Sequence, residues 1–407
     1  MRAKALLTAG ALLALLGTVP HHRNPLAGSF KIDVPPGPYV SGSRLPVSAS
    51  GVTGRVSFSL VGPGEIDGSS FVAPAVSQAT TATIIASARG AVAVRKVHIV
   101  PAPAARTPLL AVATYHNGIA LHDPKTFRLI GYMPIGGAPG DVAFTTRGAL
   151  VAPNTDGDTM ATIARDPWRL HSVQNVALGN EVAVDASTGN VFVSNRDAGG
   201  YGALTRITPQ GHLTRVKTGD TAEGLAIDAA RGIVYVGNVN DNSVAVVDAA
   251  SMRVLRKIPS VPRTFGIALD PRAQRLFVVS NTSPSMPQHS GYVAAIDLAR
   301  TNPRIVQRSA RMIFPIGAAI DLQSARLFVT DEVKDAVFVL STKTLREVHA
   351  PLTTCSTPWR PSIARGRLYV PCANADKVDV FDLRSLHRVK GAPFSTGGFP
   401  LGVALWP

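Results

Sequence analysis

Hydrophobic residues in this chain come in short runs separated by turn residues. Between 222 and 259 four runs follow one another, at Gly224 to Asp228, Ile233 to Gly237, Val244 to Asp248 and Arg253 to Ile258. Runs of about five residues rich in β-branched side chains and bounded by Gly, Asn and Asp predict strands, not helices. The inner three are apolar on both faces, which predicts a sheet that is covered on both sides.

The same four-strand pattern recurs along the chain. The Asp that closes the first run returns at Asp185, Asp228, Asp270 and Asp321. The second run returns at 191–195, 234–238, 276–281, 327–331 and 368–372. A repeat of roughly 40–45 residues that carries four strands is typical of β-propeller blades.

Three sets of short motifs resemble the YVTN family of β-propellers. They are second strands such as VYVGN and LFVTD, third strands such as VAVVD and VDVFD, and entries such as Pro315-Ile316-Gly317-Ala318-Ala319. The resemblance covers about 109–407 and implies the architecture, but it leaves the activity open because propellers host many functions. Two entries depart from the pattern, Gly140-Asp141-Val142-Ala143 and Arg360-Pro361-Ser362-Ile363.

Counting the repeats predicts seven blades. The first begins near 109 with only three strands, and the others begin near 137, 179, 221, 262, 313 and 357. Residues 399–406 copy an inner strand and have no blade of their own. We therefore expect the C-terminal strand to complete blade one, which would leave no free sheet edge at the seam.

The N-terminal quarter has a different pattern. Arg2 and Lys4 precede an apolar run from Ala5 to Leu16, so residues 1–27 are predicted to be a signal peptide, with export to the periplasm, cell surface or medium. Residues 28–101 contain short alternating runs between Pro and Gly clusters, which predict a small β-sandwich. Its segment 56–76 resembles bacterial Ig-like domains, and 102–108 is a predicted linker.

The whole chain is thus expected to be all-β, a seven-bladed β-propeller preceded by a small Ig-like β-sandwich. After the leader, no apolar stretch is long enough for a transmembrane helix. We expect an exported, monomeric protein.

Positive charge is concentrated on the predicted outer strands. The chain has 41 Lys and Arg against 26 Asp and Glu, a formal net charge of +15. Charge on an outer strand discourages edge-to-edge pairing between molecules. The alternative is attraction of an anionic polymer such as nucleic acid or acidic polysaccharide. The absence of interleaved aromatic residues favours the first interpretation.

The sequence contains no recognisable catalytic or metal motif. Its ten His residues are scattered, and there is no nucleophile elbow, Walker loop or dinucleotide fingerprint. We therefore expect no metal and no cofactor, and favour binding or scaffolding over catalysis. A propeller enzyme of the lactonase or quinoprotein kind is the alternative. The Asn residues that end second strands are expected to close turns, at Asn154, Asn195, Asn238, Asn281 and Asn374.

The loops around the central tunnel are the predicted binding surface. Alignment of the repeats brings charged and aromatic residues to the start of the inner strands. The candidate ligand-binding residues are Glu223, Phe265, Trp359, Arg360, Asp141 and Glu181. This mixture suits a small organic molecule, a peptide or a protein partner better than a metal ion. The alternative is that Phe265 and Trp359 only plug the tunnel.

Cys355 and Cys372 are the only cysteines in the chain. A hairpin turning at Arg365-Gly366 would bring both to the same end of blade seven. Export would expose them to an oxidising compartment, so we predict a disulfide, with two separately buried thiols as the alternative.

Overall fold

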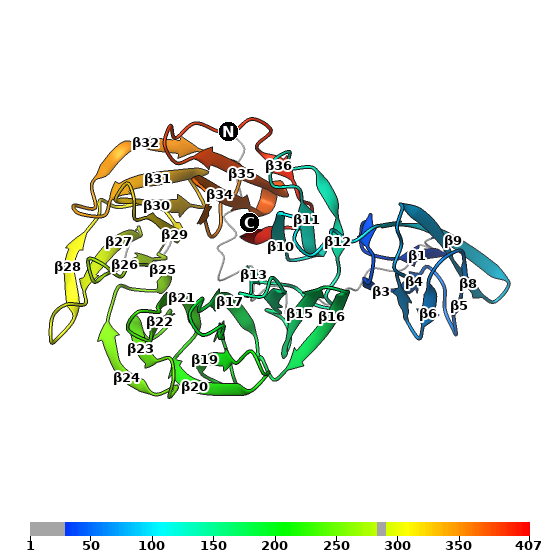
Figure 1. Ribbon diagram of the computed structural model, residues 1–407, viewed down its shortest axis with the longest axis horizontal. Helices are drawn as coiled ribbons and strands as arrows, with labels where there is room; N and C mark the ends of the chain where they lie inside the picture. The colour runs from blue at the N-terminus through cyan, green and yellow to red at the C-terminus, as the bar shows by residue number, and fades with distance from the viewer. Residues whose placement is uncertain (1–28, 283–289) are drawn as a thin grey trace.

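The structure is a computed structural model that describes residues 29–282 and 290–407. The predicted signal peptide, residues 1–27, lies outside the described residues. The described chain folds into strands, with one short 3-10 helix, η1 (Ala373–Ala375). A ring of sheets forms the larger part, and the N-terminal strands lie beside it (Figure 1).

The ring consists of seven blades of four antiparallel strands, which confirms the predicted fold. Blade one contains β37 (Pro400–Trp406), β10 (Leu109–Thr114), β11 (Gly118–His122) and β12 (Leu129–Met133). Blade two contains β13 (Ala143–Phe144), β14 (Leu150–Pro153), β15 (Thr159–Arg165) and β16 (Trp168–Gln174). Blade three contains β17 (Gly179–Val184), β18 (Val191–Asn195), β19 (Gly202–Ile207) and β20 (Leu213–Gly219).

The remaining four blades follow the same order from the axis outward. Blade four contains β21 (Ala222–Asp228), β22 (Ile233–Asn238), β23 (Ser243–Asp248) and β24 (Val254–Pro259). Blade five contains β25 (Thr264–Asp270), β26 (Arg275–Ser280), β27 (Tyr292–Asp297) and β28 (Arg304–Arg308). Blade six contains β29 (Pro315–Asp321), β30 (Arg326–Asp331), β31 (Ala336–Ser341) and β32 (Glu347–Thr353). Blade seven contains β33 (Ser362–Ala364), β34 (Arg367–Cys372), β35 (Lys377–Asp382) and β36 (Phe394–Ser395).

The core lies between neighbouring blades. Val244 and Val246 of β23 share one cluster with Leu276 and Val278 of β26, and all four side chains are buried. Because each blade packs against a blade on either side, its middle strands are apolar on both faces. This packing explains the two-sided hydrophobic runs in the sequence.

The recurring Asp residues end strands by closing turns. Asp270 Oδ1 accepts hydrogen bonds from the backbone N–H groups of Arg272 (3.0 Å) and Ala273 (2.9 Å). Asp382 Oδ1, at the end of β35, does the same for Arg384 (3.1 Å) and Ser385 (2.8 Å). These Asx turns satisfy backbone donors where the strand ends, and this explains why the Asp repeats with the blade.

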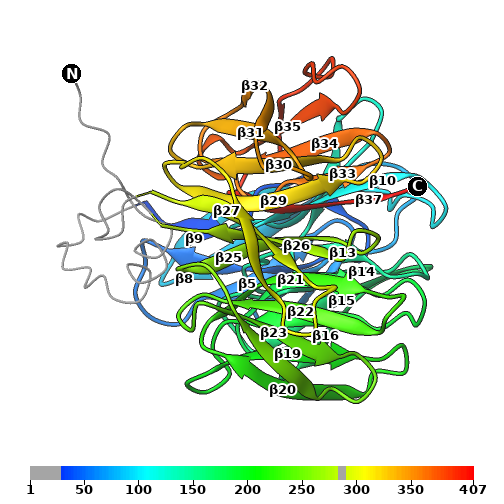
Figure 2. The ribbon, with the colours of Figure 1, turned by 90° about the vertical axis from the view of Figure 1, so that its left-hand side faces the viewer.

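The C-terminal strand closes the ring as predicted. β37 pairs antiparallel with β10 from Leu109↔Trp406 to Ala113↔Gly402. Figure 2 shows β37 beside β10, two strands from opposite ends of the propeller sequence. The first and last blades are therefore joined by the backbone hydrogen bonds of one sheet.

The N-terminal residues form two small sheets and four strands of a larger sheet, all packed around one core. They are β1 (Lys31–Asp33) with β4 (Ser48–Ser50), then β3 (Arg44–Pro46), β7 (Ser70–Val72) and β6 (Glu65–Asp67), then β2 (Tyr39–Val40), β9 (Ala91–Val100), β8 (Thr80–Ala88) and β5 (Ser57–Val61). Leu45 and Phe71 from one sheet pack with Ile84 and Ile99 from another. The two-layer packing fits a sandwich, and its Ig-like character stays a prediction.

The sequence analysis treats the fourth strand of each blade as an exposed outer edge. In blade one, however, the outer edge of the fourth strand is covered. β12 pairs in parallel with β2 at Tyr132↔Tyr39, so blade one continues into the N-terminal sheet as one eight-stranded sheet. Pairing with another part of the same chain protects this edge, whereas charged side chains occupy outer strands such as β24 and β28.

Arg165 holds the linker against the propeller. Its guanidinium lies 5.6 Å from the ring centres of Phe144 and Trp406 and 5.7 Å from that of Trp168. Its Nη2 donates to the Thr107 carbonyl oxygen (2.8 Å). The Trp168 indole N–H donates to the Pro103 carbonyl oxygen (2.6 Å). The predicted linker 102–108 is thus bound along the side of blade two.

Cys355 and Cys372 form a disulfide in blade seven, with Cα atoms 5.6 Å apart. Cys372 ends β34 and is fully buried. The bond ties the connection before β33 to the end of the second strand.

No helix in the described part of the chain combines the length and the apolar character needed to cross a membrane.

Deletion of residues 398–407 should destroy the cooperative fold. The deletion removes β37, exposing β10 on one side and the inner part of blade seven on the other. We expect aggregation or a broad thermal transition in place of a single sharp one, measured by calorimetry and light scattering. A soluble truncated protein with the wild-type transition would disprove closure by β37.

Replacement of Cys355 and Cys372 by Ser should lower the free energy of unfolding by about 3 kcal/mol, because the crosslink closes a short loop. The sequence separation of the two cysteines is 17 residues. Denaturant titration of the oxidised wild type and the double variant measures the difference. Two reactive thiols in the denatured, unreduced wild type would contradict the pairing.

Candidate functional site

The predicted mouth residues lie in bulges at the start of the inner strands or in the segments that lead into those strands. In β21, β25 and β29 the pairing with the second strand shifts after the first residue, and two residues are left outside the ladder. These unpaired residues are Glu223 and Gly224, Phe265 and Gly266, and Ile316 and Gly317. A β-bulge redirects side chains, and the repeat therefore presents one variable residue per blade at this end of the ring.

The Gly in each bulge permits close backbone contact between blades. A Cβ atom on Gly266 would lie 2.6 Å from the Ile316 carbonyl oxygen of the next blade. A Cβ atom on Gly317 would lie 2.9 Å from the Arg360 Cα atom. No side chain fits at such distances, so the glycines of the entry motif are required by packing around the axis.

Blades two and three replace this Gly with acidic residues. Asp141 and Glu181 occupy the positions equivalent to Gly224 and Gly266. Asp141 Oδ2 accepts from the Val182 backbone N–H of blade three (3.1 Å), and Glu181 Oε2 accepts from the Leu225 backbone N–H of blade four (3.1 Å). Both residues are partly buried. The carboxylates thus bridge adjacent blades.

Glu223 is the centre of a buried ionic network. Its side chain is 3% exposed, and its Oε2 accepts from Arg360 Nη2 at 3.0 Å. Arg196 pairs with the other carboxylate oxygen, and the Asn180 amide donates to Oε2. Because Arg360 belongs to blade seven, the network joins blades three, four and seven across the axis.

Phe265 and Trp359 line the same region. Their rings meet edge to face with centroids 6.2 Å apart, and the Arg360 guanidinium lies 5.8 Å from the Phe265 ring centre. Both rings are buried with Phe314, Ile316 and other apolar residues. This packing agrees with the alternative in which the two rings only plug the tunnel. The rings also form an apolar wall next to Glu223 and Arg360.

Two donors in this region have no partner among the described residues. They are the Trp359 indole N–H and Arg360 Nη1, both inaccessible to solvent. A buried donor without an acceptor costs about 1–3 kcal/mol. Buried polar groups in folded proteins are nearly all hydrogen-bonded, so two unpaired donors on adjacent residues call for an explanation, and a bound ligand would supply one.

Burial changes the acidity of the two partly buried carboxylic acids. It raises the pKa of Asp141 to about 6, against the lowering effect of Arg360 and of hydrogen bonds from Val182 and Val142. It raises the pKa of Glu181 to about 8, again opposed by Arg360, while Asp141 and Glu223 raise it further. Near neutral pH Glu181 is therefore largely protonated.

The structure brings together all six residues predicted for the mouth, and it adds Asn180 and Arg196. Asn180 occupies the same bulge position as Glu223 and Phe265, so repeat alignment could have selected it. Arg196 follows β18, and its sequence context gave no signal. In the described ranges, no three His, Cys, Asp or Glu side chains are placed to hold a metal ion.

The Asn residues predicted to close turns make other contacts, because their side chains bond to hydroxyl groups and carbonyl oxygens and not to the backbone N–H groups of an Asx turn. Asn238 Oδ1 accepts from the Thr218 hydroxyl (3.1 Å), and Asn281 Nδ2 donates to the Pro315 carbonyl oxygen (3.0 Å) of the next blade. Both are fully buried. They hold the second strand to its surroundings.

No protein-family model matches the chain, and no curated protein matches it. Solved structures do share the fold. A functionally unknown protein from Desulfotomaculum acetoxidans has a TM-score of 0.59 at 15% identity, covering 73% of this chain and 98% of that one. Two putative 6-phosphogluconolactonases, from Bacteroides uniformis and Bacteroides fragilis, have TM-scores of 0.58 at 13% and 12% identity. The match to the Bacteroides uniformis protein covers 74% of this chain and 100% of that one. The match to the Bacteroides fragilis protein covers 74% of this chain and 98% of that one.

These similarities show the fold alone. The protein is a seven-bladed β-propeller with an N-terminal β-domain.

The raised pKa of Glu181 should make stability depend on pH. The pKa lies above its unfolded value of 4.5, so its contribution is fully present below about pH 4.5 and is lost as pH rises through about 8. Between these values we expect the free energy of unfolding to fall with a slope of up to about 1.4 kcal/mol per pH unit.

Denaturant titrations of the wild type and Glu181→Gln across this range measure the effect. The variant should lose the contribution of Glu181 and keep a shallower profile, because burial also raises the pKa of Asp141 to about 6 and that of Glu332 to about 7. Glu347→Gln, at an exposed position on β32, is the matched control and should keep the wild-type profile. Parallel profiles of Glu181→Gln and the wild type would contradict the assignment.

Proposed function

We propose that the protein is a binding module whose site is the polar cluster at the inner-strand bulges of blades two, three, four, five and seven. The unpartnered Trp359 indole N–H and Arg360 Nη1, buried next to Asp141 and Glu181, carry this proposal. Unpaired donors beside carboxylic acids suit a small polar organic ligand that offers an acceptor to the donors. The aromatic wall of Phe265 and Trp359 would hold its apolar part.

A rigid site fits this role better than an adaptable one. Glu223 holds Arg360 and Arg196 in place, so the free edge of the Arg360 guanidinium is fixed before a ligand arrives. Fixed donors lose little conformational entropy on binding, which favours affinity. A peptide loop is a less suitable ligand because the two donors are buried at the end of the inner strands.

The proposal also includes the family relations and the location of the protein. The second- and third-strand motifs support a relation to YVTN-type propellers, and 56–76 supports a relation to bacterial Ig-like domains. The basic and apolar pattern of residues 1–27, with the disulfide, supports a monomeric protein that works outside the cytoplasm.

Lactone hydrolysis is the second candidate function. A Glu181 that stays protonated near neutral pH and an Asp141 with a pKa of about 6 could act as general acid and general base when water adds across the ester bond. Base consumption at constant pH with glucono-1,5-lactone tests it. Turnover that Glu181→Gln abolishes would favour the enzyme, and the absence of turnover favours the binding module.

The Trp359→Phe variant should lose ligand binding while keeping its fold. The change removes only the indole N–H and the smaller ring, and it removes an unpaired buried donor, so the free energy of unfolding should change by less than about 1.5 kcal/mol. A thermal-shift panel of small carboxylates, sugars and sugar lactones provides the measurement. At least one compound should raise the melting temperature of the wild type but not of Trp359→Phe or Arg360→Lys.

Trp406→Phe is the control, because it makes the same substitution in a different hydrophobic cluster. It should respond to the compound like the wild type. A response that persists in both Trp359→Phe and Arg360→Lys would place the ligand elsewhere and reject the proposed site.

A further inference from the structure

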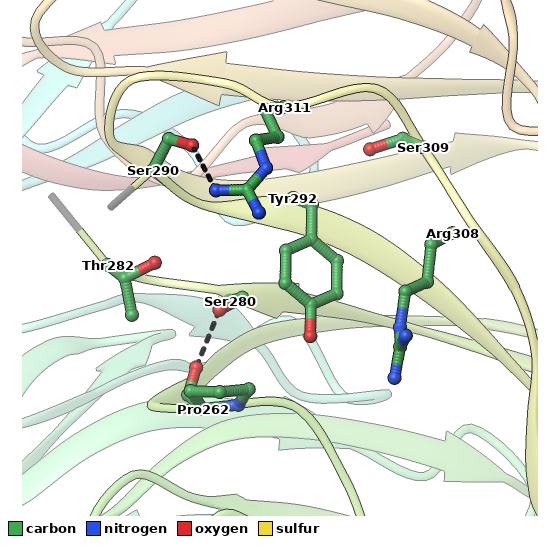
Figure 3. Close-up of a pocket in the computed structure, with 8 residues that line it drawn as sticks. All are labelled: Pro262, Ser280, Thr282, Ser290, Tyr292, Arg308, Ser309 and Arg311. Carbon is green, nitrogen blue, oxygen red and sulfur yellow. Dashed lines mark hydrogen bonds between the residues drawn. The ribbon is translucent and has the colours of Figure 1, made fainter. Parts of the chain in front are cut away.

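A pocket of about 310 Å³ lies on blade five and shares no residue with the cluster at the inner strands. Its lining comes from the connection between β24 and β25, from the ends of β26 and β28, from residues on either side of the β26–β27 connection, and from the connection to blade six. The lining residues are Pro262, Ser280, Thr282, Ser290, Tyr292, Arg308, Ser309 and Arg311. Figure 3 shows them around the pocket, with Arg311 reaching Ser290.

The pocket is basic and contains no acid. Two guanidinium groups and five hydroxyl-bearing side chains line it, and none of its lining residues is Asp or Glu. In the described part of the chain, no ion pair includes Arg308. Neither 1–28 nor 283–289 contains Asp or Glu, so the chain has no further carboxylate that could neutralise it.

Tyr292 orients Arg308. The Arg308 guanidinium lies 5.6 Å from the centre of the Tyr292 ring, and Figure 3 shows the two side chains next to each other. A guanidinium placed on a ring face keeps its N–H edges available for a second partner. Its planar donor fork matches the oxygen spacing of a phosphate or sulfate group.

The serines shape the wall and leave the donor role to Arg308 and Tyr292. Ser309 Oγ accepts from the Val293 backbone N–H (2.9 Å) and donates to the Ala310 carbonyl oxygen (2.7 Å). Ser280 Oγ donates to the Pro262 carbonyl oxygen (2.7 Å). The Ser309 bonds fix the connection after β28 against β27, and the Ser280 bond ties the end of β26 to the segment before β25.

A second pocket of about 450 Å³ adjoins the first. It shares Arg308, Ser309 and Arg311 with it and adds Arg346 of blade six. One carboxylate, Glu347, belongs to this second lining. The shared arginines therefore form a basic ridge with a hollow on either side, and of the two hollows the one on blade five has no carboxylate in its lining.

We propose that the blade-five pocket binds a tetrahedral oxyanion, a phosphate or sulfate group, through Arg308, Arg311 and the Tyr292 hydroxyl. The group can be a free anion or an ester carried by an acidic saccharide chain that continues into the adjoining pocket. Recognition is local to this pocket and does not come from the general positive charge of the outer strands.

Titration calorimetry of the full-length protein with two probes separates the sources. The probes are inorganic phosphate and a heparin-derived hexasaccharide, each at about 50 mM and about 150 mM salt. Binding of inorganic phosphate indicates that the group itself suffices. Binding of the hexasaccharide alone indicates the chain-borne ester. Either result supports the proposal, provided that Arg308→Gln weakens binding of the probe by about tenfold or more.

Arg304→Gln is the matched control, since it removes the same charge from the same strand outside both pockets. It should change affinity by less than about twofold. Tyr292→Phe keeps the ring beside Arg308 and removes only the hydroxyl, and it should weaken binding by about threefold to tenfold. Equal losses in Arg304→Gln and Arg308→Gln, or no binding of either probe at the lower salt concentration, would overturn the proposal.

Discussion

Pairing of β37 with β10 is the constraint on which the propeller depends. A propeller blade buries its two apolar faces only between two neighbours, so an open ring would leave two blades half covered. The last strand of the chain supplies the inner strand of the first blade, from Leu109↔Trp406 onward, and so converts a row of repeats into a closed ring. Every other contact around the axis requires this closure.

Closure of the ring also determines which positions near the axis can carry a polar side chain. Blade-to-blade contact near the axis is so close that Gly266 and Gly317 accept no side chain. A residue other than Gly in that position must therefore interact directly with the next blade, as Asp141 does with Val182 and Glu181 with Leu225. The acidic exceptions bring ionisable groups to a part of the ring where solvent is limited. Their pKa values rise for the same reason.

The ring and the N-terminal domain are joined more firmly than a flexible linker would allow. The parallel pair β2–β12 makes one continuous sheet, and Arg165 holds the linker among Phe144, Trp168 and Trp406. The N-terminal domain thus covers an outer edge that blade one would otherwise expose. Blades four and five keep exposed, basic outer strands, and the blade-five pocket is on this uncovered side of the ring.

The sequence by itself determined the repeat, the number of blades and the strand that closes the ring. These features are local: each depends on β-branched runs, on an Asp such as Asp270 that closes a turn, and on a Gly such as Gly266 in a bulge. The position of the six predicted mouth residues at one end of the ring follows for the same reason, since a repeat places equivalent residues at equivalent positions. The pairing of Cys355 with Cys372 was also predictable, because a single hairpin brings both residues to the same end of blade seven.

Only the tertiary structure decided how residues of different blades meet. The contact between Glu223 and Arg360 joins positions 137 residues apart, and Arg196 enters the network from a loop with no motif. The covering of β12 by β2 and the basic pocket beside Tyr292 likewise depend on the packing of separate segments. Alignment of repeats predicts which end of a blade a residue occupies. The distances, the unpaired donors and the raised pKa values arise when the closed ring removes these side chains from water.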